Sequence, residues 1–198
     1  MSHEYDVEIL HLLVSGGHAY FGRAKDGAAE IPTVDAARAE VVAGKGIVGD
    51  RFFGKAAHMD AAVTLFAIES LEAIAAELGA APFDPMLPRR NVVLRGAELA
   101  PLIGQDFSLV GAGGRVDFHG GRHAHPCAWM DTVLAPGAHK AMRGRGGLRN
   151  PEGAGAVFHK RFDAQKGSAG RIGERPFRKG LVRLHIHAEG KAGGRSEL

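Results

Sequence analysis

Residues 123–131 of this chain, HAHPCAWMD, hold the only cysteine and the only tryptophan among 198 residues. Cys127 follows His123 and His125 at two-residue intervals, and the proline directly before it restricts the entering backbone. A thiolate is a nucleophile and a soft metal ligand, and positive neighbours such as Arg122 favour this form. A lone cysteine is also among the residue types most often buried. The spacing alone favours the interpretation of Cys127 as a small buried hydrophobe.

A zinc site is one alternative for this stretch. On a β-strand, His123, His125 and Cys127 would point to one face. Structural zinc sites usually combine two separated pairs of ligands. The one candidate for a second pair is His185 with His187, close to the C-terminus. The pattern therefore gives zinc little support.

Three segments rich in glycine or arginine are candidates for binding an anion: GKGIVGDRFFGK (44–55), RRN (89–91) and GRGGLR (144–149), which contains Arg145. Glycines allow backbone N–H groups to point at an anion, and arginines bind phosphate through two parallel hydrogen bonds. The spacing is that of neither a P-loop nor a dinucleotide fingerprint, and each segment could equally be a turn with surface charges. Together with a thiolate, these segments suit a phosphate-bearing cofactor that carries a metal.

The composition is that of an ordinary globular protein, with 45% hydrophobic and 24% charged residues. A single cysteine cannot form an intrachain disulfide, and no apolar run approaches the roughly 18 residues that span a bilayer. With no signal sequence at the N-terminus, we expect a cytoplasmic protein without a membrane segment. The net charge is −3 over residues 1–148 and +6 over residues 149–198. Few stacking aromatics accompany the basic end, so nucleic acid is not a favoured partner.

Short apolar segments separated by glycines predict a mainly β protein, a closed or partly open barrel with peripheral helices. Strands are expected at 5–14, 39–43, 63–67, 91–94, 107–110 and 116–118. The only helix expected with regular apolar spacing covers residues 68–78, followed by Gly79 at the position of a C-terminal cap.

The order of five segments resembles the MOSC domain, the C-terminal domain of molybdenum cofactor sulfurases that also occurs as stand-alone bacterial proteins. The segments are GKGIVGDRFFGK, VTLFAIESLEAI (63–74), RRNVVLRGAELAPLIGQDF (89–107), HPCAWMD (125–131) and GRGGLR. The resemblance covers about residues 5–149. It implies a barrel-like β fold and a molybdenum–pterin cofactor.

The resemblance also implies roles for individual residues. Cys127 matches the family's hallmark cysteine, which ligates molybdenum or carries sulfur. The residues that match the motifs lining the pterin and phosphate region are Gly49, Asp50, Arg51, Arg90 and Asn91. Arg122 and His125 are expected to hydrogen-bond around the metal centre because they lie close to Cys127 in sequence.

The resemblance ends near residue 149, where the charge balance also changes. We therefore divide the chain into a MOSC-like domain, 1–149, and an atypical basic tail rich in Gly and Arg, 150–198. The tail is either an extension or a segment translated in a shifted frame. In the second case the barrel lacks its closing strand, unless the alternating segment LVRLHIHAE (181–189) replaces it.

Three functions are compatible with these features. The first is a molybdenum-dependent oxidoreductase that reduces N-oxygenated small molecules. It would need a separate electron-donating reductase, because the chain has no flavin, haem or iron–sulfur motif. The second is a sulfur carrier or cofactor-transfer module with a persulfide on Cys127, supplied by a sulfur donor protein. The third is a catalytically degenerate MOSC domain.

Overall fold

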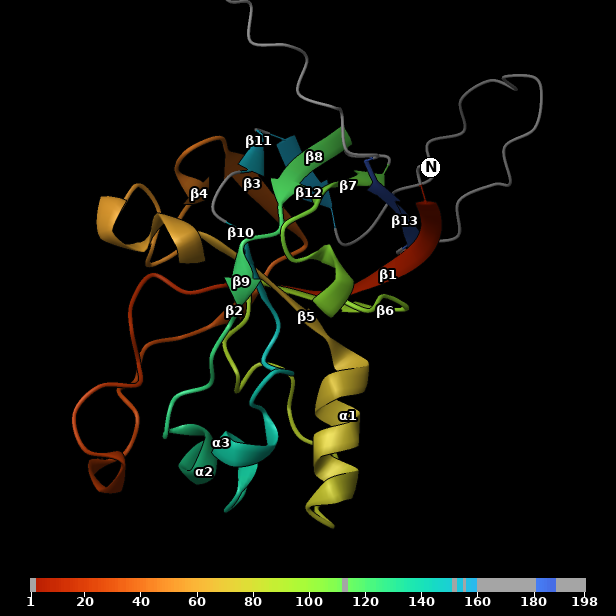
Figure 1. Ribbon diagram of the computed structural model, residues 1–198. Helices are drawn as coiled ribbons and strands as arrows, with labels where there is room; N and C mark the ends of the chain where they lie inside the picture. Colours follow the sequence, from red (N-terminus) through yellow and green to blue (C-terminus); the bar gives the residue numbers. More distant parts are fainter. Residues whose placement is uncertain (1–2, 112–113, 151–152, 155, 160–180, 188–198) are drawn as a thin grey trace, which may run out of the picture.

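The computed structural model describes residues 3–111, 114–150, 153–154, 156–159 and 181–187. The chain forms a curled half-barrel of β-strands with few helices (Figure 1). The strands are β1 His3–Val14, β2 Val34–Asp35, β3 Arg38–Val42, β4 Gly46–Ile47, β5 Val63–Ala67, β6 Val92–Arg95, β7 Asp106–Gly111, β8 Gly114–His119, β9 Arg122–His123, β10 Leu148–Asn150, β11 Gly153–Ala154, β12 Ala156–His159 and β13 Leu181–Ile186. The α-helices are α1 Ile68–Glu77, α2 Met130–Val133 and α3 Ala138–Ala141, and three 3-10 turns cover Ala24–Asp26, Ala56–Ala61 and Ala100–Leu102.

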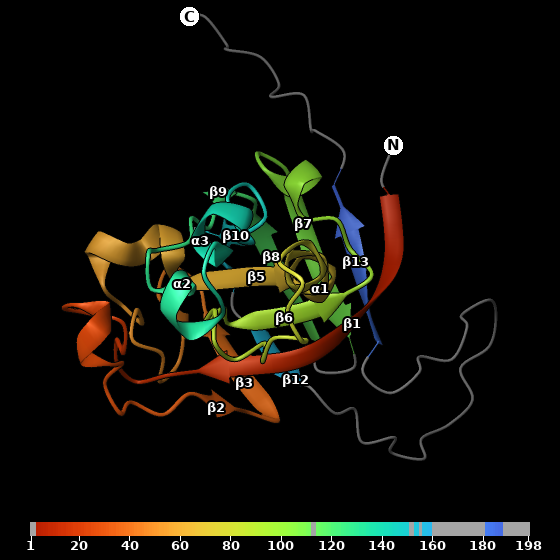
Figure 2. The ribbon, with the colours of Figure 1, turned by 90° about the horizontal axis from the view of Figure 1, so that it is seen from below.

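The main sheet has the strand order β11-β8-β7-β13-β1-β6-β5-β10-β9, and β2 pairs with β1 beside this path. A second sheet has the order β12-β3-β4. The pairs are antiparallel except for β5 and β6, which are parallel and are connected through α1. Seen from below, α1 lies end-on under the sheet, and β13 lies beside β1 (Figure 2).

Strand β5 is buried over its whole length because it separates two apolar clusters. Leu65 faces the barrel interior, where it packs with residues such as Phe107 and Leu184. Phe66 faces the other side and packs in a cluster with Leu71 of α1. A strand with both faces covered is expected to be continuously apolar, as VTLFA is. The helix predicted at 68–78 is present, with Leu78 as its C-terminal cap residue and Gly79 following at φ 61°.

The segment proposed as a substitute closing strand does enter the main sheet. β13 pairs antiparallel with β1 on one side and with β7 on the other. Val182 and Leu184 alternate into the core, and the His185 Nδ1 lies 2.7 Å from a carboxylate oxygen of Glu4 in β1. The edges of β1 and β7 are therefore covered here. Residues 160–180 and 188–198 lie outside the described part, and the division of the chain at residue 149 stays a prediction.

Within the described ranges, the structure has no helix of the length and apolar character needed to cross a membrane.

Position 147, just before β10, requires a glycine because of its backbone angle and because of the atoms around it. Its φ is 98°, and an added Cβ would lie 2.3 Å from the carbonyl oxygen of Leu65. We expect Gly147→Ala to lower the free energy of unfolding by about 3 kcal/mol or more. Gly144 is a matched control, because its φ is 74° but nothing lies within 4 Å of an added Cβ. Gly144→Ala should cost about 1 kcal/mol in urea unfolding, and equal losses for the two variants would contradict the steric argument.

Candidate functional site

A buried hydrogen-bond network joins three segments that are far apart in sequence. The Asp50 carboxylate accepts hydrogen bonds from the Ser15 N–H, the Phe52 N–H and the Asn91 side chain. The Asn91 amide also donates to the Leu13 carbonyl and accepts from the N–H and hydroxyl of Thr64. Both residues are buried, so these bonds satisfy polar groups that water cannot reach. Asp50 and Asn91 therefore hold the end of β1, the glycine loop and the RRN segment together.

Arg51 and Arg89 lie against this network. One Arg89 Nη donates to the carbonyl oxygen of Gly17 at 2.6 Å and to the Ser15 hydroxyl. Arg51 donates to the Arg89 carbonyl and contacts Asp50 at 3.5 Å. Burial lowers the pKa of both arginines, and for Arg89 the charge of Arg51 lowers it further. Arg89 is also the only non-glycine residue of the described chain with a positive φ, at 54°. A strained, buried arginine beside another arginine is typical of a functional site.

Arg90 links this region to the cysteine segment. Its guanidinium donates to three carbonyl oxygens, those of Gly146, Ala124 and His125. The pKa of Arg90 is lowered to about 10, mainly by burial and also by the charge of Arg149, while Cys127 acts in the opposite direction. Arg90 thus fixes the backbone that leads to Cys127 and places its own charge near the sulfur.

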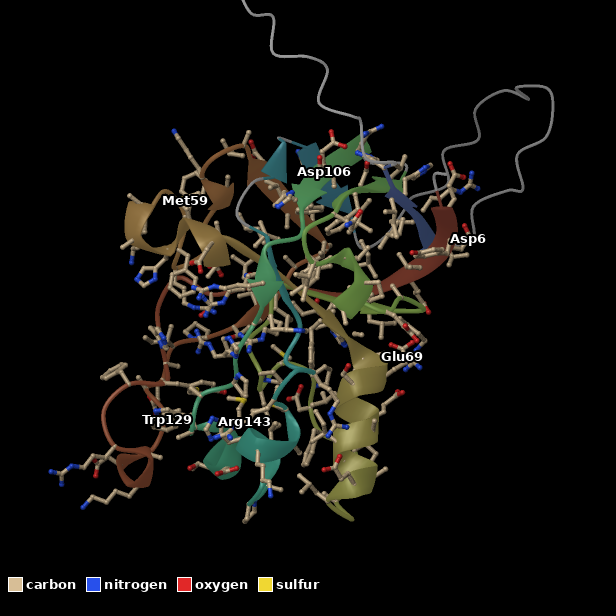
Figure 3. The ribbon with its side chains drawn as sticks, viewed as in Figure 1. Asp6, Met59, Glu69, Asp106, Trp129 and Arg143 are labelled. Carbon is tan, nitrogen blue, oxygen red and sulfur yellow. The ribbon has the colours of Figure 1, made fainter. Side chains whose placement is uncertain are left out.

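Cys127 itself is exposed, so the interpretation as a buried core residue is wrong. The neighbouring Trp129 is buried and stacks on Tyr20 with ring centroids 5.5 Å apart. Tyr20 donates to the Leu87 carbonyl and lies under the Arg89 guanidinium. Figure 3 shows Trp129 on the side of the molecule away from Asp6 and Asp106. The loop after β1 is therefore packed against the cysteine segment.

A second group of charges lies where β9 and β10 pair. The Asp60 carboxylate accepts from Arg122 through two nitrogens and from Arg149 at 3.1 Å. The hydrogen bonds from Arg122 are the main reason that the pKa of Asp60 is lowered. The Arg122 guanidinium is therefore engaged in hydrogen bonds to the Asp60 carboxylate.

The structure brings together most of the residues predicted from sequence. Hydrogen bonds join the glycine loop to the RRN segment, because Asn91 donates to Asp50 and Arg51 donates to the Arg89 carbonyl. Arg90 in turn donates to the His125 carbonyl, in the segment that carries Cys127. Gly49 has a φ of 82° in the turn before Asp50. The exposed side chain of His125 has no described hydrogen bond, and only its carbonyl is engaged.

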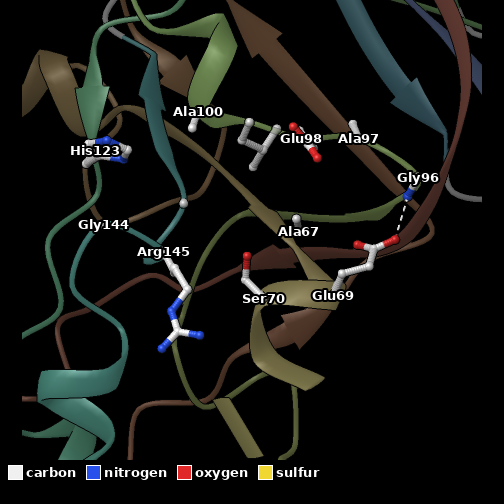
Figure 4. Close-up of a pocket in the computed structure, with 12 residues that line it drawn as sticks. Ala67, Glu69, Ser70, Gly96, Ala97, Glu98, Ala100, His123, Gly144 and Arg145 are labelled. Carbon is white, nitrogen blue, oxygen red and sulfur yellow. Dashed lines mark hydrogen bonds between the residues drawn. The ribbon is translucent and has the colours of Figure 1, made fainter. Parts of the chain in front are cut away.

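Arg145 lies apart from this group. It donates to the Ala141 carbonyl and to Glu77 of α1, and it lines a separate cavity near α1 (Figure 4). The described residues contain no group of three or more His, Cys, Asp or Glu side chains able to hold a metal, so the zinc alternative gains no support.

The sequence did not predict that three buried arginine nitrogens lack a hydrogen-bond partner. In the part of the chain that the structure describes, the buried side-chain nitrogens without a hydrogen-bond partner are the Nε atoms of Arg51, Arg89 and Arg149. Buried guanidinium N–H groups are rarely left unpaired, and an anion would satisfy them. The RRN motif pointed to Arg89, but only the fold shows that it faces Ser15 and Tyr20.

The described site therefore combines buried arginines, held by a rigid hydrogen-bond network, with an exposed thiol on a mainly β, half-barrel fold. A family model for the MOSC domain matches residues 43–183, so this chain belongs to the MOSC domain family. That match extends beyond residue 149, where the resemblance in sequence motifs ends.

Solved structures with the same fold have low sequence identity. YuaD from Bacillus subtilis superimposes with a TM-score of 0.65 and 14% identity, covering 95% of this chain and 100% of that chain. YiiM from Geobacillus stearothermophilus gives a TM-score of 0.56 and 16% identity, covering 94% of this chain and 77% of that chain. No curated protein matches the chain significantly. These similarities establish the fold alone.

The ionisation of His18 should report on the charges of Arg51 and Arg89. Burial lowers the pKa of His18, and the charges of Arg51, Arg89 and His58 lower it further. We therefore expect an NMR titration to give a pKa below the usual 6.5, so that His18 is uncharged at pH 7. Because unfolding restores the higher value, this histidine makes the fold less stable as the pH falls through 6.5.

Arg51→Gln should raise the His18 pKa, whereas Arg143→Gln, an exposed site that does not affect His18, should leave it unchanged. An anion bound among the arginines should raise the same pKa. An unchanged value in Arg51→Gln would mean that the arginine charge does not reach His18.

Proposed function

We propose that this MOSC domain binds a molybdenum–pterin cofactor, with Cys127 as the protein ligand to the metal and the buried arginines holding the phosphate. The observation that carries the proposal is the pair of unpaired, buried Nε atoms of Arg51 and Arg89, in the same region as an exposed thiol. A doubly charged phosphate suits several guanidinium groups, and a thiolate suits a soft transition metal. The residues of the site therefore have the chemistry needed to hold a molybdenum–pterin cofactor.

Each residue of the site has a distinct task in this proposal. Arg51 and Arg89 supply N–H donors from a wall that Asp50 and Asn91 keep rigid. Arg90 positions the Cys127 backbone through the carbonyls of Ala124 and His125. Because these groups are fixed before a ligand arrives, little ordering entropy is lost on binding.

The proposed activity is reduction of an N-oxygenated small molecule. An N–OH group, two electrons and two protons give an N–H group and water, and the bound cofactor would supply the redox centre for this step. The chain's own residues bind and orient the cofactor and leave Cys127 at the surface, where a substrate can approach. Electrons would come from a separate reductase.

A second function is favoured by the exposure of Cys127. A surface thiol is able to exchange sulfur with a donor protein, whereas a buried thiol is not. Under this alternative Cys127 carries a persulfide and the arginines hold an anionic acceptor.

The test uses the full chain made in a host that synthesises the cofactor. Molybdenum per chain is measured by elemental analysis, and reduction of a hydroxylamine-type substrate is followed with an artificial electron donor. Molybdenum close to one per chain together with turnover supports the oxidoreductase. Cyanide-labile sulfur without molybdenum supports the sulfur carrier, and absence of both supports a degenerate site.

A further inference from the structure

The cavity that contains Arg145 lies outside the thiol site and has a volume of about 420 Å³. It is bounded by the start of α1, the loop after β6, His123 of β9 and the loop before β10. The space exists because many lining positions are small, among them Ala67, Gly96, Ala97 and Gly144. Its volume is within the range of small-molecule sites, about 300–1,000 Å³.

The charged groups of this cavity are separated by sign. Figure 4 shows the cation Arg145 on the same side as the imidazole of His123, the carboxylates of Glu98 and Glu69 on the other side, and Ser70 between them. The middle is formed mainly by alanine side chains, so an apolar chain would fit between the two charged ends. A ligand complementary to this arrangement carries opposite charges at its two ends.

Several of these polar groups are free to bind. Among the residues that the structure describes, the side chains of Ser70, Glu98 and His123 make no hydrogen bond to the protein. Arg145 uses Nε and one Nη for Ala141 and Glu77, which leaves donors of its other Nη available. Glu69 differs, because one of its oxygens accepts from the Gly96 N–H at 2.8 Å and so fixes the carboxylate at the cavity wall.

We propose that this cavity binds a small zwitterion with an amine and a carboxylate at opposite ends of a short apolar chain. The carboxylate pairs with Arg145 and the amine with Glu98, while Ser70 and His123 provide further hydrogen bonds. The site is independent of the cofactor proposal, because none of the residues that line it belongs to the network of Asp50, Arg89 and Cys127.

The test titrates the full-length protein with 5-aminopentanoate and with two probes that each lack one charge, pentylamine and pentanoate. Binding is followed by amide NMR shifts of Gly96, Gly144 and Gly147, which surround the cavity. We expect 5-aminopentanoate to shift these amides and to bind at least tenfold more tightly than either single-charge probe. Equal affinities for the three probes, shifts confined to other residues, or no shift would overturn the proposal.

Two variants test which residue binds the carboxylate and which binds the amine of the ligand. Arg145→Gln should weaken pentanoate and 5-aminopentanoate at least tenfold and leave pentylamine unchanged, whereas Glu98→Gln should weaken pentylamine and 5-aminopentanoate. Arg143→Gln is the matched control, because Arg143 is exposed and does not line the cavity. Loss of the surface ion pair between Arg145 and Glu77 costs little stability, so the variant should remain folded. Equal weakening of all three probes by either variant would contradict the proposed orientation.

Discussion

Replacing Cys127 with serine is expected to lower the molybdenum content of protein made in a cofactor-competent host by at least about tenfold. A serine hydroxyl is a harder, weaker donor than a thiolate and does not match a soft metal. The arginines would still attract the phosphate, so some cofactor should be retained without its protein ligand. Elemental analysis of molybdenum, paired with extraction and fluorescence detection of the pterin, separates metal loss from loss of the whole cofactor.

This variant should fold as well as the parent chain. Cys127 is exposed, so the change from sulfur to oxygen neither opens a cavity nor buries a polar group. Urea unfolding is the control, and an unchanged midpoint makes any metal loss a property of the site. Full molybdenum content in the folded serine variant would remove Cys127 from the metal's coordination.

The second large effect concerns Asn91. Asn91→Ala removes four side-chain hydrogen bonds and leaves the buried Asp50 carboxylate, the Leu13 carbonyl and the Thr64 N–H each with one partner fewer. An unsatisfied buried polar group costs about 1–3 kcal/mol, and more when it is charged. We expect the free energy of unfolding to fall by about 3–5 kcal/mol. Urea unfolding followed by the fluorescence of Trp129, the only tryptophan, measures it directly.

Thr64→Val is the matched control for this network. It removes the hydroxyl that bonds Asn91 but keeps the Thr64 N–H and nearly the same volume. Its cost should be about 1–2 kcal/mol, clearly below that of Asn91→Ala. Similar costs for both variants would show that Asn91 does not organise Asp50 and the β1 end.

The sequence predicted elements whose signal is local. The apolar run of β5 and the three- and four-residue spacing of α1 are set by their own residues, and both occur where predicted. The two-residue strands β2, β4, β9 and β11 were missed, because so short a segment has no periodicity of its own. Their pairing depends on partners far away in the chain, as β2 depends on Leu13 and Val14.

The site was predictable in residue type and much less in arrangement. Asp50 and Asn91 were predicted to line the ligand site, and in the structure their side chains form hydrogen bonds within the protein. Arg145 and Arg149 come from the same glycine-rich segment but face different parts of the molecule. Spacing along an irregular loop does not fix the direction of a side chain, because each glycine admits several backbone angles.

The exposed position of Cys127 has a practical consequence for handling the protein. As the only cysteine of the chain, it gives every thiol reagent a single point of attachment, so a spin label or fluorophore placed there reports from the candidate site alone. Air oxidation can form one kind of disulfide between molecules, which joins the Cys127 residues of two copies of the chain. A dimer joined in this way would place the two candidate sites face to face and close them to ligands until a reductant separates them.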